Sequence, residues 1–177
     1  MVQVYTGDGK GKTSAAMGAV LRAAGQGLRV CVIQFMKAGA VPGEVKALAA
    51  LPAQVQVYRF GKKPKPGEDF AWVDPKNPAE EDLQEAREAF ECAKKAITSD
   101  EHDLVVLDEV NVASAWGLIR KEDVLKLLDE KPERVEIILT GRGASQELLA
   151  RANLVTEMVC VKHPFEQGAP VRKGIDI

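Results

Sequence analysis

The stretch that decides the fold is Val2-Gln3-Val4-Tyr5-Thr6-Gly7-Asp8-Gly9-Lys10-Gly11-Lys12-Thr13. It begins as an apolar, strand-like run, passes through a turn rich in glycine, and leads into a helix-forming segment that ends at Gly25. Glycines let the backbone curl so that successive N–H groups converge on one anion, and the positive N-terminal end of the following helix adds to the attraction. The stretch therefore predicts a phosphate-binding loop between the first strand and the first helix.

Two side chains give this loop its expected chemistry. Lys12 supplies a mobile cation for phosphate oxygens, and the Thr13 hydroxyl can join the shell of a bound Mg²⁺. The other expected nucleotide contacts are Gly7, Asp8, Gly9, Lys10, Gly11 and Ser14, and for Lys10 a solvated side chain is the alternative. The general pattern G-x-x-x-x-G-K-[ST] would need glycine where this chain has Thr6, but the strand–loop–helix context fits. A surface turn is the alternative, and it does not explain this register after a buried strand.

Apolar runs alternate with helix-period segments along the rest of the chain. The strands are expected at residues 2–5, 29–35, 55–58, 104–107, 135–139 and 155–161. The helices are expected at residues 13–24, 43–51, 79–96, 122–128 and 146–152. Consecutive apolar positions indicate strands buried on both faces. The chain is therefore predicted to be an α/β protein of the P-loop NTPase type, with a mostly parallel six-stranded sheet, helices on both faces and a single domain over residues 1–177.

The middle of the chain carries two local expectations. Asn77 can cap the helix over residues 79–96, with Pro78 at its first position and Glu80 closing a capping box. Residues 61–78 contain four prolines and several lysines, and the stretch is too long for a simple connection. It is expected to be either a mobile linker or a loop that covers a substrate.

An apolar run over residues 104–107 ends in two carboxylates, Asp108 and Glu109. Ligands of an open parallel sheet bind beyond the carboxyl ends of its strands. The first and fourth strands are therefore expected to bring Thr13 and at least one of these carboxylates to the same Mg²⁺. The alternative is that the pair caps a helix beginning near Asn111. Which carboxylate would contact the metal is open on the sequence.

The composition excludes several classes of protein. Lys and Arg number 24 and Asp and Glu 26, a net charge of −2, which argues against general binding of nucleic acid or of a membrane surface. Cys31, Cys92 and Cys160 form no C-x-x-C pair and are expected to be reduced, with Cys31 and Cys160 packed inside strands. No apolar run is long enough to span a bilayer, and no signal-peptide profile opens the sequence, so a cytoplasmic location is expected.

Several blocks of the sequence together resemble one family. They are Thr6-Gly7-Asp8-Gly9-Lys10-Gly11-Lys12-Thr13-Ser14-Ala15-Ala16, Arg22-Ala23-Ala24-Gly25-Gln26-Gly27, Gln34-Phe35-Met36-Lys37, Val105-Val106-Leu107-Asp108-Glu109, Thr140-Gly141-Arg142-Gly143, Val161-Lys162-His163-Pro164-Phe165, and the ending Gly168 with Lys173-Gly174-Ile175-Asp176. In this order, and over almost the whole chain, they are similar to the ATP:cob(I)alamin (corrinoid) adenosyltransferases of the corrinoid-pathway type.

The resemblance implies a particular reaction and its ligands, which are ATP, Mg²⁺ and a corrinoid such as cobalamin. Co(I) of the reduced corrinoid attacks C5′ of ATP, triphosphate leaves, and adenosylcobalamin is made. ATP is implied to lie in the reverse sense along the loop, so that the ribose carbon is exposed. Co(I) has no proton to lose, so no general base is needed. The protein must supply alignment and charge stabilisation of the leaving triphosphate, and residues 7–13, with Lys12 and Mg²⁺, are expected to provide the charge stabilisation.

Three further residues take expected roles. Phe70 and Trp72 resemble the family's Phe-x-Trp pair, whose implied catalytic role is to displace the lower axial ligand of the corrinoid and so ease the reduction of Co(II). The alternative is that both aromatic rings anchor the irregular loop onto the core. Arg142 follows the fifth expected strand and is expected to contact phosphate or substrate.

Two departures from better-known relatives change the expectations. Those relatives carry an N-terminal arm that can lie over a bound corrinoid, whereas here the first strand starts at Val2. The corrinoid pocket is therefore expected to be more open, or to be closed by residues 61–78 or by a second subunit. Asp8 stands where relatives often have Asn, and it can accept hydrogen bonds from ribose hydroxyls.

Partners and rival functions complete the expectations. The resemblance implies a homodimer, and a reductase or a supplier of reduced flavin as a partner. One rival is another P-loop ATPase or small-molecule kinase, in which Glu109 orients a water or a hydroxyl. The other is a non-catalytic, nucleotide-responsive carrier of corrinoids.

Overall fold

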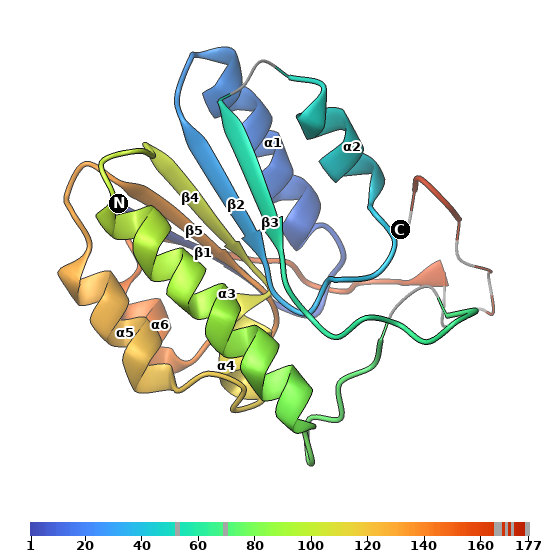
Figure 1. Cartoon of the computed structure of the whole chain (residues 1–177). Helices are drawn as coiled ribbons and strands as arrows, with labels where there is room; N and C mark the ends of the chain where they lie inside the picture. Colours follow the sequence, from blue (N-terminus) through green and yellow to red (C-terminus); the bar gives the residue numbers. More distant parts are fainter. Residues whose placement is uncertain (52–53, 69–70, 165–167, 169, 171, 176–177) are drawn as a thin grey trace.

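The structure is a computed structural model that describes residues 1–51, 54–68, 71–164, 168, 170 and 172–175. Its centre is a sheet of six strands in the order β3-β2-β4-β5-β1-β6 (Figure 1). The strands are β1 (Val2–Thr6), β2 (Val30–Gln34), β3 (Val55–Arg59), β4 (Leu104–Asp108), β5 (Glu136–Thr140) and β6 (Leu154–Glu157). All five pairings are parallel, and each expected strand is present, which confirms the predicted α/β fold.

Helices cover both faces of this sheet. They are α1 (Lys12–Gly25), α2 (Gly43–Ala49), α3 (Glu80–Thr98), α4 (Val110–Ala115), α5 (Lys121–Glu130) and α6 (Gln146–Arg151). α1 and α2 contribute to the apolar core on one face, and α3 to α6 contribute to the core on the other (Figure 1). No helix in the described ranges is long and apolar enough to cross a bilayer.

The central strands are buried on both sides, because successive side chains of a strand point to opposite faces. In β4, Val105 and Leu107 belong to the core cluster on the side of α3, whereas Leu104 and Val106 belong to the cluster on the side of α1. The alternation places the last residue of this strand, Asp108, on the side of α1. A polar residue at the end of a buried strand is thereby aimed at the first turn of α1.

The edge strand β6 differs from the central strands, since all four of its residues are exposed. It pairs with β1 alone and ends at Glu157, four residues before the expected end at Val161. The chain turns at Met158, whose N–H donates to the Thr6 carbonyl at 2.9 Å and whose carbonyl accepts from the Gly9 N–H at 2.6 Å. With these two hydrogen bonds, the apolar residues that follow β6 contact the phosphate loop and do not continue the strand.

The cysteines are free, as expected, but only one of the two expected strand positions is correct. Cys31 is fully buried in β2, and burial raises the pKa of its thiol to about 12. Cys160 lies beyond the end of β6 and is half-buried, so its expected place inside a strand is wrong.

The start of α3 also differs from the expectation. The helix begins at Glu80, and Ala79 is its N-cap residue. The Asp82 carboxylate accepts a hydrogen bond from the Ala79 N–H at 3.0 Å. The expected capping pair is Asn77 with Glu80. The observed pair, Ala79 with Asp82, has the same three-residue spacing but lies two residues further along the chain.

Residues 60–68 and 71–79 connect β3 to α3 without a helix or a strand, and they extend beyond the carboxyl ends of the strands (Figure 1). The start of this connection is held against α3. The Gly61 N–H donates to the Glu85 carboxylate at 2.9 Å, and the Lys62 ammonium lies 3.7 Å from Asp82.

Candidate functional site

The phosphate loop is shaped by its contact with Met158. Gly7 has a φ of +90°, and a Cβ at this position would come within 2.5 Å of the Met158 carbonyl oxygen. A Cβ at Gly9 would come within 2.7 Å of the same oxygen. Real Cβ atoms do not approach backbone so closely, so only glycine fits at either position. The last glycine of the loop, Gly11, is the N-cap residue of α1.

The side chain of Lys12 is buried inside this loop, with only 8% of the residue exposed. Its ammonium donates hydrogen bonds to the carbonyls of Gly7 at 2.6 Å and of Gly9 at 2.7 Å. Burial lowers the pKa of Lys12, and the nearby Arg142 guanidinium lowers it further, while the Glu109 carboxylate opposes both effects. The loop thus holds a cation where the sequence predicts phosphate oxygens to bind.

Three neighbouring strands end in polar residues that form a buried row. Gln34 at the end of β2 is in register with Asp108 at the end of β4, and Thr140 ends the next strand, β5. All three are fully buried. The Gln34 amide donates to Asp108 Oδ2 at 3.1 Å, and the Thr140 hydroxyl donates to Asp108 Oδ1 at 2.7 Å. Asp108 is therefore the centre of the row.

Thr13 joins this row from the first turn of α1. Its hydroxyl donates to Asp108 Oδ1 at 2.9 Å, so two of the three residues that the sequence assigns to a metal, Thr13 and Asp108, do meet. Both offer oxygen atoms, which Mg²⁺ prefers as ligands. In the described part of the chain, no cluster of three or more His, Cys, Asp or Glu residues could hold a metal. The pair Thr13 and Asp108 fits a magnesium ion whose remaining ligands would be phosphate oxygens and water.

The charge of Asp108 is held by its partners. Burial alone would raise the pKa of Asp108, but the Lys37 ammonium and the hydrogen bonds from Lys37, Thr140 and Thr13 outweigh burial and lower it. The Lys37 ammonium lies 2.6 Å from Asp108 Oδ2. Asp108 is thus an ionised carboxylate inside the protein, as a metal ligand has to be.

Glu109 is placed differently from its neighbour. It is the N-cap residue of α4 in the left-handed conformation, with a φ of +66°, and its side chain makes no capping hydrogen bond. Its backbone N–H donates to the Thr140 hydroxyl at 3.0 Å. Burial raises the pKa of Glu109 and the Asp108 charge raises it further, although Lys37 lowers it. The alternative of a helix cap near Asn111 is thus met in position, since Glu109 is the N-cap residue of α4, but without a capping hydrogen bond from its side chain.

Three residues of this site, Gln34, Lys37 and Thr140, lie in blocks that carry the family resemblance, but the sequence predicts no role at the site for any of them. Gln34 and Thr140 carry a signal in hindsight, because each is the polar last residue of an apolar strand and is in phase with the side chains that face α1. Lys37 carries no such signal. It follows Met36, which has a φ of +59°, and this left-handed turn brings the lysine back over the end of β2.

The remaining residues of the loop lie at its mouth. Arg142 donates a hydrogen bond to the Asp8 carbonyl at 3.3 Å, and its Nε lies 3.6 Å from the Asp8 carboxylate. Lys10 donates to the Ile175 carbonyl at 2.7 Å, so the C-terminal segment lies beside the loop. Ser14 is exposed in the first turn of α1. Arg142 and Asp8 therefore meet at the mouth of the loop, whereas the Ser14 side chain faces solvent.

The aromatic pair is described only in part. Phe70 lies outside the described residues. Trp72 is 79% exposed, in the connection between β3 and α3. A side chain so exposed does not anchor a loop by burial.

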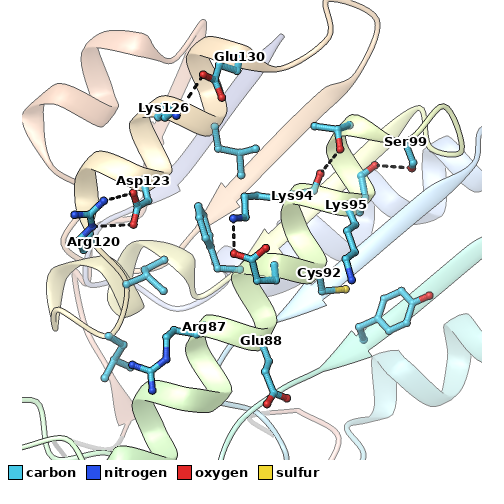
Figure 2. A pocket seen from close by; sticks show the side chains of 18 of the residues that line it. Arg87, Glu88, Cys92, Lys94, Lys95, Ser99, Arg120, Asp123, Lys126 and Glu130 are labelled. Carbon is cyan, nitrogen blue, oxygen red and sulfur yellow. Dashed lines mark hydrogen bonds and ion pairs between the residues drawn. The ribbon is translucent and has the colours of Figure 1, made fainter.

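A large hollow on the described surface lies elsewhere. It measures about 1310 Å³, runs along α3 and α5, and contains none of the expected site residues. Figure 2 shows its side chains pairing with one another, as in the ion pairs of Arg120 with Asp123 and of Lys126 with Glu130. Five Lys or Arg residues and five Asp or Glu residues line it, so it offers no net charge to a polyphosphate. The phosphate loop, not this hollow, is the candidate site.

Known proteins resemble the chain over its length. The family of ATP:corrinoid adenosyltransferases BtuR/CobO/CobP matches residues 1–177. A corrinoid adenosyltransferase of Escherichia coli K12 is 36% identical over 99% of this chain and 85% of its own length. One from Pseudomonas aeruginosa is 35% identical over 98% of this chain and 81% of its own length, and the corrinoid adenosyltransferase CobA of Salmonella typhimurium is 34% identical over 99% and 85%. The chain belongs to the ATP:corrinoid adenosyltransferase family.

Proposed function

We propose that the phosphate loop and the ends of β2, β4 and β5 form the active site of this enzyme. As a member of its family, the chain transfers the 5′-deoxyadenosyl group of ATP to Co(I) of a reduced corrinoid and releases triphosphate, making adenosylcobalamin. The roles of individual residues below are our proposal.

The observation that carries the proposal is the 2.9 Å hydrogen bond between the Thr13 hydroxyl and Asp108. It joins the residue after the loop lysine to the end of the fourth strand, although β5 lies between β1 and β4 in the sheet. Thr13 and Asp108 would hold the magnesium ion, which supplies positive charge to the phosphates when bound. Glu109, whose carboxylate makes no hydrogen bond among the described residues, is the second acidic group and would orient water molecules of the metal shell.

The phosphate chain of ATP would lie along residues 7–13. The triphosphate gains negative charge at its leaving oxygen when the C5′–O bond breaks, so positive groups aimed at it stabilise the transition state. The Lys12 ammonium is already directed into the loop by two carbonyls, and the phosphate oxygens would take over those hydrogen bonds. Arg142 and Lys10 add charge at the mouth of the loop, and Asp8 would accept hydrogen bonds from the ribose.

The corrinoid would approach from the side of the connection between β3 and α3. This segment extends beyond the carboxyl ends of the strands, where the phosphate loop also lies (Figure 1). We propose that Trp72, exposed there, and Phe70 would displace the lower axial ligand of the cobalt when the corrinoid is bound. An exposed indole is able to cover an apolar face of a ligand, which is an arrangement typical of binding loops.

Four further features belong to the proposal. The chain acts as one domain over residues 1–177, forms a homodimer, receives electrons for the cobalt from a reductase or from reduced flavin, and works in the cytoplasm. Sedimentation of the purified chain and assays with candidate reductants would test the dimer and the electron source separately.

The test of the function is an analysis of products. The purified chain is incubated with ATP, Mg²⁺ and chemically reduced cobalamin. Triphosphate should form in equal amount to the new cobalt–carbon bond, which is followed by its absorption spectrum. Formation of ADP and phosphate without alkylation of the corrinoid would overturn the proposal in favour of an ATPase or kinase. Tight binding of both ligands without turnover would do so in favour of a carrier.

A further inference from the structure

Lys37 places an ammonium between the two residues proposed to hold the metal. Its Nζ lies 2.6 Å from Asp108 Oδ2 and donates to the Thr13 hydroxyl at 3.3 Å. A magnesium ion bound by Thr13 and Asp108 would need the same two side chains. Two cations packed against one carboxylate and one hydroxyl would repel each other strongly at this burial. Lys37 and the metal are therefore alternatives for one position.

The backbone around Lys37 is built to direct this ammonium. Met36 has a left-handed φ of +59°, which is uncommon for a residue other than glycine. The turn is clamped from outside, since the Lys37 N–H donates to the Phe60 carbonyl at 2.7 Å and a Cβ at Gly61 would come within 2.9 Å of the Lys37 nitrogen. A conformation that costs energy persists when its surroundings hold it, and such turns concentrate at functional sites.

The charge balance of the site gives a reason for this arrangement. The Asp108 side chain is fully buried, while that of Lys37 is 26% exposed. A buried carboxylate without a cation is strongly unfavourable, so Asp108 has to be neutralised before a metal arrives. Lys37 does this from a partly solvated position, and its flexible stem allows the ammonium to leave without unfolding the core.

We propose that Lys37 is a tethered cation that occupies the metal position between Asp108 and Thr13 and is displaced when a divalent ion binds there. The inference rests on the proposed role of Thr13 and Asp108 in the active site. Because Lys37 already neutralises Asp108, a metal ion that binds alone gains little electrostatic free energy. A metal that arrives with a polyphosphate brings a new anionic partner for the displaced ammonium. Lys37 thereby favours entry of metal and nucleotide together over entry of the metal alone.

A merely structural salt bridge and a displaceable cation predict opposite effects on metal binding. If Lys37 only held the fold together, its replacement would leave metal affinity unchanged or weaken it. If Lys37 competes with the metal, its replacement exposes a full negative charge and must tighten metal binding. The direction of the change therefore decides between the two roles, whatever happens to stability.

The experiment measures the binding of Mn²⁺ alone to the full chain, without ATP or corrinoid, from the electron paramagnetic resonance signal of the free ion. Lys37→Met and Lys37→Gln should each bind Mn²⁺ about tenfold more tightly than the wild type, a change equivalent to ~1.4 kcal/mol. Lys37→Gln keeps most of the length and a hydrogen-bond donor, so it remains informative if Lys37→Met does not fold. Adding Asp108→Asn to either variant should abolish the gain.

Two controls complete the test. Lys46→Met removes a lysine exposed on α2 and should leave Mn²⁺ affinity unchanged. In the wild type, Mg²⁺ at a concentration that saturates the site should raise the rate at which an amine-reactive reagent labels Lys37 several-fold, as read by peptide mass spectrometry. Unchanged or weaker Mn²⁺ binding in a folded Lys37 variant, an equal gain in Lys46→Met, or an unchanged labelling rate would overturn the proposal. Adenosyl transfer by the wild type is assayed separately, so failure of this inference and failure of the proposed function are distinguishable.

Discussion

The two ends of the sheet carry the same kinds of side chain and use them differently. At the carboxyl end, Asp108 is fully buried and its partners include Lys37 and Thr13. At the amino end, Asp103 pairs with Arg29 through three hydrogen bonds at 2.8–3.1 Å, but both side chains are partly exposed. The carboxyl end therefore concentrates charge inside the protein, and the amino end leaves it at the surface.

The difference shows that this fold buries charged groups at the carboxyl end of the sheet, where burial is costly, and not at the amino end. Buried charges are expensive unless they are paired, and proteins retain them mainly where chemistry needs them. Exposed ion pairs cost little and contribute little. At the amino end, the ion pairs of Arg134 with Asp100 and of Glu136 with the Met1 amino group follow the second pattern, since each has a partner that is largely exposed.

The largest effect that follows from this contrast concerns Lys12. Lys12→Ala should lower adenosyl transfer by about 100-fold or more, because removal of one preorganised donor at a developing anion has an effect of that order. ATP affinity should fall in parallel, measured by calorimetry. Lys126→Ala, which removes an exposed lysine of α5, is the matched control and should keep full activity. Equal losses of adenosyl transfer in the two variants would mean that the positive charge of Lys12 has no specific role in catalysis.

A second test divides the effect of Asp108 between function and stability. Asp108→Asn keeps the shape but removes the charge, and we expect kcat/KM with Mg²⁺ to fall about 100-fold, equivalent to ~2.7 kcal/mol. The variant also separates Lys37 from its counter-ion. Because Lys37 is partly solvated, the loss in the free energy of unfolding should be smaller than the ~3–5 kcal/mol typical of a fully buried pair. Urea denaturation and steady-state kinetics on the same preparation measure both quantities. Near wild-type activity in a variant of reduced stability would make Asp108 a structural residue.

Much of this comparison could be predicted from the sequence, because its main elements are local. The strand–loop–helix pattern around Lys12 and Thr13 is contiguous, and the apolar run before Asp108 fixes that carboxylate at a strand end. The meeting of Thr13 with Asp108 then follows from the rule that parallel strands present their carboxyl ends to one edge. Nothing beyond strand order is needed to bring them together.

What the sequence could not give depends on contacts between distant segments. Gln34 and Thr140 join Asp108 only through the register of β2, β4 and β5. Lys37 depends on a left-handed turn at Met36, a residue type that does not signal one. The early end of β6 depends on hydrogen bonds between Met158 and the phosphate loop, which compete with an apolar run that would otherwise continue the strand.

A third, smaller effect tests the exposed aromatic residue near the carboxyl end. Trp72→Ala should leave the free energy of unfolding within ~0.5 kcal/mol of the wild type, because the side chain is 79% exposed. Transfer that starts from Co(II) with a reductant should fall about tenfold, equivalent to ~1.4 kcal/mol, while transfer from pre-reduced Co(I) should be nearly unchanged. Anaerobic assays from the two starting states measure the ratio. An equal fall from both states would assign Trp72 to positioning of the loop and not to the axial ligand.

The smallest effect belongs to the amino end of the sheet and should be confined to acid stability. Hydrogen bonds from Arg29 lower the pKa of Asp103 to about 2 in the folded protein, whereas an unfolded aspartate has a pKa near ~3.9. A carboxyl group whose folded pKa is lowered stabilises the protein above its unfolded pKa, and this contribution is lost as the pH falls from ~4 towards ~2. Asp103→Asn should remove that part of the pH dependence, by less than ~1 kcal/mol because the pair is exposed, and adenosyl transfer should not change. Urea midpoints between pH 2 and pH 5 measure it, with Glu133→Gln at the same end as the control. A loss of adenosyl transfer in Asp103→Asn would contradict the contrast between the two ends of the sheet. It would show that an exposed charge at the amino end affects the reaction at the carboxyl end.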